Sequence, residues 1–182
     1  MDLKEAQDYF YNLHDVECNQ KYNGTLPYSF HLECVVKQAE KFIYLIPNVK
    51  LRSDNSFSND TLREAIYVAC YGHDAIEDAR VTYNDIEQKF GEEIAEIIYC
   101  CTEEKGRNRS ERHNQEYYNL LIHNNLAIFV KLCDIIANVK FSLLMNSSMY
   151  IKYKKEYNKR RTMLYRQEYD DMFVYLDNLF KI

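Results

Sequence analysis

Glycine and proline, the residues that most often interrupt helices, are scarce in this chain. Its 182 residues contain four glycines and two prolines, where average usage of roughly 7% and about 5% would supply several times more. Such scarcity favours long helices and argues against turn-rich all-β folds and low-complexity chains. The length also suits one domain with a sizeable core. We therefore expect an all-α bundle of about eight helices without a substantial sheet, formed as a single domain over residues 1–182.

The overall composition excludes several classes of protein. Hydrophobic residues make up 47% of the chain, too many for a disordered protein. A net charge of −5 argues against a protein that coats nucleic acid, because that function needs a basic surface. No apolar run approaches the roughly 18 residues of a membrane span, and the N-terminus carries acids where a secretory signal needs bases. We expect a cytoplasmic protein without nucleic-acid or membrane partners, and its oligomeric state stays open.

The six cysteines form no Cys-x-x-Cys pair, and most lie among apolar residues. This placement is typical of small buried side chains in a reducing compartment. It favours buried thiols over a disulfide or zinc framework.

Hydrophobic periodicity predicts the helical segments. They cover residues 3–18, 28–46, 62–71, 83–90, 92–101, 111–123, 126–144 and 149–180. Thr82 and Asp85 have the spacing of a capping pair at the start of the fourth segment. Polar residues at 48–59 and 103–112 predict loops.

The last segment is expected to be one long helix from about residue 149. Its tyrosines recur four residues apart, at Tyr153 and Tyr157 and again at Tyr165 and Tyr169, which describes one face and favours a core or oligomer contact. Its bases are expected in solvent: Lys154, Lys155, Lys159, Arg160 and Arg161.

Charge is segregated along the chain. Residues 74–104 hold ten acids and two bases, whereas residues 131–166 hold nine bases and two acids. Two solvated faces of opposite sign would explain this pattern. The functional interpretation is an acidic, metal-rich centre beside a basic rim that holds phosphate.

The candidate chemistry begins with a His-Asp dipeptide. The chain has two of these, His14-Asp15 and His73-Asp74, and the second follows a segment that reads as a buried helix. Glu77 and Asp78 come four residues after His73 and Asp74, so on a helix each lies over its partner. Because carboxylates crowded near an apolar core repel one another, a bound cation is the economical solution.

Two further ligands can be sought on neighbouring helices. His31 lies on an earlier helix, and Asp134 lies inside one of the most apolar runs of the chain. Taken alone, the histidine would be interpreted as a satisfied core or surface residue, and the aspartate as a helix cap or one half of a salt bridge. Taken together with His73 and Asp74, they form a mixed imidazole and carboxylate set that suits Mn(II), Fe(II) or Zn and leaves coordination positions for water.

The order His, His-Asp, Asp resembles that of the HD superfamily of metal-dependent phosphohydrolases. The flanking motifs are similar to those of alarmone hydrolases, meaning the hydrolase half of RelA/SpoT proteins and the small free-standing members. The similar segments are Lys21 to His31 with Gly24 and Pro27-Tyr28, His73-Asp74-Ala-Ile-Glu77-Asp78 with Thr82, Phe90-Gly91-Glu-Glu-Ile94-Ala95, Thr102-Glu-Glu-Lys105 with Glu111-Arg112, and Lys131-Leu-Cys-Asp134-Ile-Ile-Ala-Asn138. The resemblance covers roughly residues 12–142 and implies a single HD-type domain of the small kind, without a synthetase domain.

The resemblance also implies roles for individual residues. It implies one divalent metal, typically Mn(II), held by His31, His73, Asp74 and Asp134. It implies that Glu77 and Asp78 are the catalytic acids. The substrate-binding residues it implies are Lys21, Tyr28, Lys105, Arg112 and Asn138. The implied reaction removes the 3′-pyrophosphate of guanosine 3′,5′-bis(pyrophosphate)-type alarmones by a metal-activated water.

Some positions depart from that family. Lys21 stands where arginine is usual, Leu32 where proline is usual, and Ile135 where a base is usual. Two alternatives therefore stay open. One is an HD phosphomonoesterase that acts on another phosphorylated nucleotide or on NADPH and releases phosphate instead of pyrophosphate. The other is a non-catalytic nucleotide-binding HD module.

Overall fold

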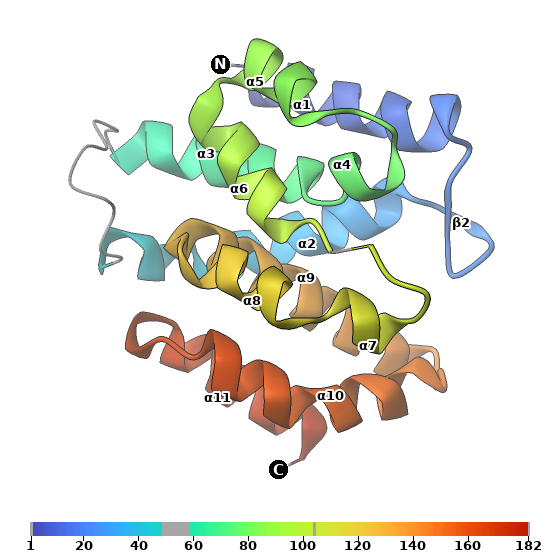
Figure 1. The fold of residues 1–182 in the computed structure, drawn as a ribbon, viewed down its shortest axis with the longest axis vertical. Coiled ribbons are helices and arrows are strands. Elements are labelled where there is room, and N and C mark those ends of the chain that lie inside the picture. The colour runs from blue at the N-terminus through green and yellow to red at the C-terminus, as the bar shows by residue number, and fades with distance from the viewer. Residues whose placement is uncertain (1, 49–58, 104, 182) are drawn as a thin grey trace.

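The computed structural model describes residues 2–48, 59–103 and 105–181 (Figure 1). Its helices and strands, in chain order, are α1 (Leu3–Tyr11), β1 (Lys21–Tyr22), β2 (Leu26–Pro27), α2 (Ser29–Phe42), α3 (Asn59–Gly72), α4 (Ala75–Asp78), α5 (Tyr83–Phe90), α6 (Glu92–Cys101), α7 (Arg109–Arg112), α8 (Gln115–Ile122), α9 (Asn125–Leu144), α10 (Met149–Leu164) and α11 (Asp170–Phe180). A π-helical turn at Asn12–Glu17 continues α1, and 3₁₀ turns lie at Ile43–Asn48 and Gln167–Tyr169. The loop predicted at 48–59 lies almost wholly outside the described residues.

The all-α prediction is confirmed. Within the described residues, the strands form one two-stranded antiparallel sheet, in which Lys21 pairs with Pro27 and Tyr22 with Leu26. The helices number more than the expected eight for two reasons. The very short α4 and α7 form where turns or loops were expected, and the last predicted helix is divided.

The expectation of one long helix over 149–180 is wrong. The backbone leaves the helix at Tyr165, whose ψ is 130°, and Arg166 is extended. The chain then turns back, so that α10 and α11 form a hairpin in which the Tyr150 hydroxyl donates to the Leu179 carbonyl and Lys154 donates to the Phe180 carbonyl. This hairpin buries the aromatic faces of both helices against each other, which a straight helix would leave in water.

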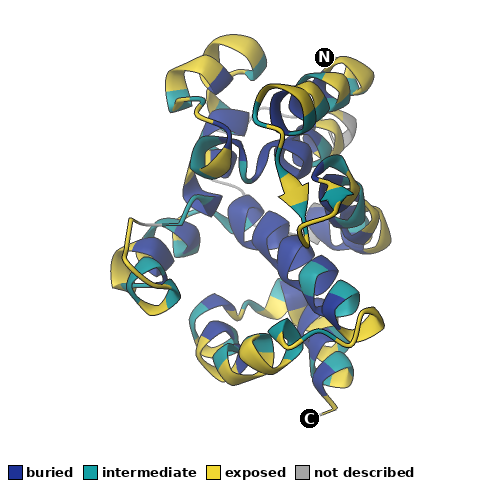
Figure 2. Ribbon diagram, turned by 90° about the vertical axis from the view of Figure 1, so that its right-hand side faces the viewer, coloured by how far each residue is buried: buried dark blue, intermediate teal, exposed yellow. Residues whose placement is uncertain are grey.

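Helix α9 is the centre of the fold. In Figure 1 it runs through the middle of the molecule, with α1, α3 and α5 above it and the α10–α11 hairpin below. It packs against α2, α3, α6, α8, α10 and α11, and most of its side chains are buried. Figure 2 shows the same separation of buried inner faces from exposed outer faces across the molecule. The charged side chains of Lys131 and Asp134 lie within this buried stretch.

Shorter elements follow the local sequence signals. Thr82 and Asp85 form the predicted capping box at the start of α5, and Gly91, at φ +92°, separates α5 from α6. The six cysteines form no disulfide, and four of them are buried, as predicted. Among the described helices, none combines the length and the hydropathy that a membrane span requires.

Gly72, the last residue of α3, lets side chains of α1 and α6 pack closely against α3 next to the His73-Asp74 pair. A Cβ atom at this position would lie 2.5 Å from Phe10 Cζ and 2.6 Å from Ile98 Cδ1, both on buried side chains. We expect Gly72→Ala to lower the free energy of unfolding by about 1–3 kcal/mol, because α1 and α6 must shift to admit the methyl group. Urea titration measures this loss. Glu64→Ala, at an exposed position of the same helix, is the control and should stay within about 0.5 kcal/mol of the parent; equal stability of the two variants would contradict the prediction.

Candidate active site

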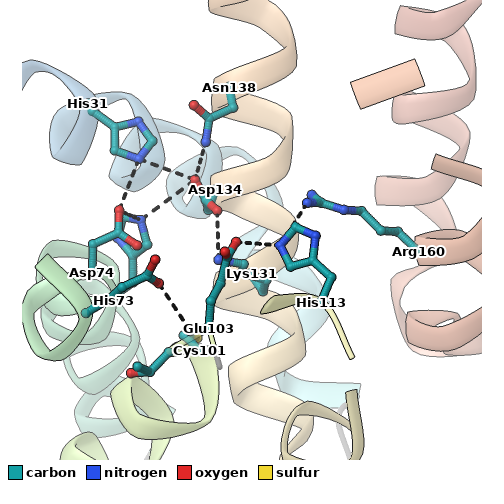
Figure 3. Close-up of polar contacts among 12 residues, drawn as sticks. His31, His73, Asp74, Cys101, Glu103, His113, Lys131, Asp134, Asn138 and Arg160 are labelled. Atoms are coloured by element: carbon teal, nitrogen blue, oxygen red, sulfur yellow. Dashed lines mark hydrogen bonds and ion pairs between the residues drawn. The ribbon is translucent and has the colours of Figure 1, made fainter. Parts of the chain in front are cut away.

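Four side chains from three parts of the fold converge at the centre of the molecule (Figure 3). His31 comes from α2, His73 and Asp74 from the junction of α3 and α4, and Asp134 from α9. His31 Nε2 lies 3.3 Å from Asp134 Oδ1 and 3.7 Å from Asp74 Oδ2. His73 Nε2 lies 2.9 Å from Asp74 Oδ2 and 3.7 Å from Asp134 Oδ1. The structure therefore brings together all four residues that the sequence comparison implied as metal ligands.

The donor atoms of this cluster fit a cation. Single ligand atoms of His31, His73 and Asp74 all lie within 4.8 Å of one another. The Nδ1 of His73 lies 2.9 Å from the Cys70 carbonyl oxygen, so Nδ1–H donates to it and Nε2 faces the carboxylates. Because the carboxylates favour a positive charge at Nε2, this nitrogen carries a proton in the metal-free protein. A metal ion placed between the imidazoles and the carboxylates would take the place of that proton.

The charges around the cluster also favour a bound cation. Burial alone would lower the pKa of His73, but the Asp74 and Asp134 carboxylates raise it well above its ordinary value. Burial alone would raise the pKa of Asp134, but Lys131, with Nζ 3.2 Å from Asp134 Oδ2, holds it well below its usual range. The site therefore keeps its carboxylates ionised and attracts positive charge.

Glu77 and Asp78 stand beside the cluster on α4. Glu77 accepts a hydrogen bond from the backbone N–H of Glu103 at 3.1 Å, and its Oε1 lies 3.3 Å from Arg112 Nη1. Burial, together with the Asp74 charge, raises the pKa of Glu77 to about 7. Burial and the same Asp74 charge also raise the pKa of Asp78. Glu77 can therefore gain or lose a proton near neutral pH, and the pKa of Asp78 is shifted in the same direction.

The first His-Asp dipeptide also reaches this region, which the sequence did not indicate. His14 is buried, and its Nδ1 lies 2.6 Å from Gln20 Oε1. The amide of Gln20 then donates to Asp78 Oδ2 at 2.8 Å. The neighbouring Asp15 has a different role, because its carboxylate accepts the backbone N–H of Ser29 at the start of α2.

The residues implied as substrate contacts divide into two groups. Tyr28 donates to Asp74 Oδ2, Asn138 donates to Asp134 Oδ1, and both line the cavity together with Arg112. Lys21 and Lys105 are exposed and do not line it. Their implied contacts with substrate remain predictions.

An open cavity of about 150 Å³ lies against the cluster. Its remaining wall is basic and comes from α7, α9 and α10: Arg109, Arg112, Lys131 and Arg160. The expectation that Arg160 is solvated is wrong, because its side chain is buried and lies 3.1 Å from Glu156 Oε2. Glu156 also accepts from Arg109 Nε at 2.8 Å, so one carboxylate orients two guanidinium groups toward the cavity.

A second network of buried polar side chains connects Arg160, in the basic wall, to the segment that binds Glu77. Glu103 Oε1 lies 2.5 Å from His113 Nε2, and Arg160 Nη2 lies 3.5 Å from the same nitrogen (Figure 3). Burial would raise the pKa of Glu103, but the His113 hydrogen bond and the Lys131 charge lower it to about 2. Glu103 therefore stays ionised and holds the segment whose backbone N–H binds Glu77.

Comparisons with known proteins agree with this geometry. No family model matches the chain. A Danio rerio protein named guanosine-3′,5′-bis(diphosphate) 3′-pyrophosphohydrolase MESH1 is 31% identical over 68 residues, which are 37% of this chain and 38% of that protein. The Drosophila melanogaster protein of the same name is 26% identical over 77 residues, 42% of this chain and 43% of that protein. The matches thus span less than half of these curated relatives.

The fold match extends much further. A solved structure described as a metazoan ortholog of SpoT that hydrolyses ppGpp superposes with a TM-score of 0.68 and 19% identity, covering 98% of this chain and 93% of that one. This confirms the fold that the resemblance implied. In part of its sequence the chain is therefore similar to proteins named ppGpp 3′-pyrophosphohydrolase, and in its fold it is similar to a metazoan ortholog of SpoT.

Proposed function

We propose that the chain is an enzyme that removes the 3′-pyrophosphate of ppGpp-type alarmones. The observation that carries this proposal is that the cluster of His31, His73, Asp74 and Asp134 shares one cavity with a group of basic side chains. A phosphorylated nucleotide is a small molecule that needs both features, a metal at the scissile phosphate and cations around the others. The single buried core that the described helices share supports one domain over residues 1–182.

The charges that line the cavity explain why substrate and metal belong together. The carboxylates are Asp74, Glu77, Asp78, Glu103 and Asp134, against the bases Arg109, Arg112, Lys131 and Arg160. Because Glu77 is only partly ionised near neutral pH, these five carboxyl groups and four bases leave the cavity close to neutral. A divalent cation at the histidines makes it positive, so an anionic substrate gains affinity once the metal is bound.

The donor set suits Mn(II), with Fe(II) or Zn as alternatives, because it mixes two imidazoles with two carboxylates. A metal held there supplies Lewis-acid polarisation of a phosphate oxygen and lowers the pKa of a water molecule. Glu77, with its pKa raised to about 7, accepts the proton of the attacking water. Asp78, whose pKa is also raised, provides the proton for the leaving oxygen. Arg109 and Arg160, oriented by Glu156, hold distal phosphates.

One observation favours the second candidate, a phosphomonoesterase that acts on another phosphorylated nucleotide or on NADPH. Lys21, which the resemblance places at the nucleotide, is exposed outside the cavity, and the neighbouring Tyr22 lines the wall instead. The metal and the two catalytic acids are the same in both candidates. They differ in the shape of the nucleoside pocket and in the product.

A substrate panel distinguishes these candidates. We expect purified protein with Mn(II) to release pyrophosphate from ppGpp and pppGpp, and to lose this activity on chelation of the metal. Lys155→Ala, at an exposed position of α10 outside the cavity, should leave turnover unchanged, while Arg109→Ala should raise KM. Release of inorganic phosphate from NADPH or another nucleotide, without pyrophosphate, would replace the first candidate with the second. Nucleotide binding without any turnover in Mn(II) would contradict both.

A further inference from the structure

The two histidines of the cluster are held in different ways. A metal-binding histidine usually donates its second ring N–H to an acceptor, which fixes both the tautomer and the direction of the ring. His73 follows this rule through the Cys70 carbonyl. His31 does not, because its Nδ1 is buried without a hydrogen-bond partner among the described residues. Something other than a hydrogen bond must therefore orient the ring of His31.

Aromatic rings surround His31 instead. The Tyr22 ring stacks on the imidazole with centroids 4.7 Å apart and planes 16° apart. The Tyr28 ring meets its edge at 5.4 Å and 68°. Phe141 packs against the Tyr22 ring at 4.7 Å, so the stacked tyrosine is itself held in place. An offset stack of this kind fixes the plane of a ring as well as contributing packing energy.

The hydroxyl of Tyr22 reaches a second ligand. It donates to Asn138 Oδ1 at 2.9 Å, and the Asn138 amide nitrogen lies 2.5 Å from Asp134 Oδ1. The amide of Asn138 is thereby oriented with its N–H toward Asp134.

We propose that Tyr22 is a positioning residue for the metal centre: its ring fixes His31 by stacking, and its hydroxyl fixes Asp134 through Asn138. The inference rests on the proposed metal centre and adds a residue that the motif comparison did not contain. The two short strands present it, since Tyr22 lies on β1 opposite Leu26 of β2. The β1–β2 hairpin thus helps to position two proposed ligands, His31 and Asp134, which are 103 positions apart in the chain.

Mn(II) affinity of the purified full chain tests this proposal, measured by calorimetry without any substrate. Tyr22→Leu removes the ring and the hydroxyl, and we expect about 10-fold to 100-fold weaker Mn(II) binding, the range for lost support of a metal ligand. Tyr22→Phe keeps the stacked ring and loses only the hydrogen bond, so we expect a loss of about 3-fold. This conservative variant also guards against failure of Tyr22→Leu to fold.

Phe30→Leu is the matched control. Phe30 also packs on Tyr22 and Phe141, with centroids 6.2 Å and 5.8 Å away, but its ring is partly exposed and does not line the cavity. Its Mn(II) affinity should equal that of the parent. Parent-like affinity in Tyr22→Leu overturns the proposal, and so does an equal loss in Tyr22→Phe and Tyr22→Leu, or in Phe30→Leu and Tyr22→Leu.

The same measurement separates this inference from the proposed function. If the parent protein binds Mn(II) but does not hydrolyse ppGpp, the substrate assignment fails while the series of affinities still decides the role of Tyr22. If the parent protein does not bind Mn(II), the metal centre and the role of Tyr22 are overturned together.

Discussion

Replacement of Glu77 by glutamine is expected to abolish hydrolysis and, in the same protein, to raise stability at alkaline pH. The glutamine keeps the shape of the side chain but cannot accept a proton from water. Loss of a general base typically costs about 10²–10⁴ in rate, and Glu77→Gln combined with Asp78→Asn should leave no measurable turnover. Steady-state release of pyrophosphate at saturating Mn(II) measures the effect.

The stability effect follows from the raised pKa of Glu77, which is about 7 in the folded protein against an ordinary value of 4.5. Below pH 4.5 the group is protonated in both the folded and the unfolded states, so it does not alter stability. As the pH rises from 4.5 to about 7, the unfolded state ionises at no cost, whereas the folded state has to ionise a half-buried carboxyl group beside Asp74. Stability is therefore lost over this range in the parent protein and kept in the variant.

We expect metal-free Glu77→Gln to exceed the parent by up to about 3 kcal/mol at alkaline pH and to match it in acid. Urea unfolding at the two pH values measures the difference. Glu87→Gln, at an exposed position of α5, should show neither effect. Retention of more than about a tenth of the parent rate, or a destabilised variant at alkaline pH, would contradict the assignment of Glu77 as a buried base.

The sequence predicted the cluster of proposed metal ligands better than it predicted the surroundings of that cluster. The spacing of His73 and Asp74 from Glu77 and Asp78 is local, so helical geometry alone indicated that these four side chains belong together. Asp134 was added to this group because an acidic side chain within an apolar segment requires a partner. Lys131 carries the same signal three positions earlier, and that spacing on one helix face could have identified it.

The basic wall depended on tertiary structure instead. Arg160 looked solvated because its neighbours in sequence are lysines and arginines, and the helix was expected to continue without a break to residue 180. No glycine or proline marks the turn after Leu164. The α10–α11 hairpin forms because both helices have aromatic faces to bury, and it directs Arg160 inward to Glu156. Tyr22 was missed for a similar reason, since its contacts with His31 and Asn138 join residues distant in the chain.

Replacement of Asp134 by asparagine tests a carboxylate for which we propose two roles, as a metal ligand and as the partner of the buried Lys131. Lys131 is 3% exposed, with its ammonium 3.2 Å from Asp134. Asp134→Asn leaves that ammonium in the core without its closest negative charge, a change that typically costs about 3–5 kcal/mol. We expect this loss in urea unfolding of the metal-free protein, together with loss of Mn(II) binding and of activity.

The double variant Lys131→Met with Asp134→Asn separates the two roles. Methionine fills a similar volume without a charge, so the double variant should recover most of the stability that Asp134→Asn loses. Binding of Mn(II) and hydrolysis should not recover, because the ligand is still absent. A double variant that regains activity along with stability would show that Asp134 acts only as the counter-ion of Lys131, and the metal would then rest on His31, His73 and Asp74 alone.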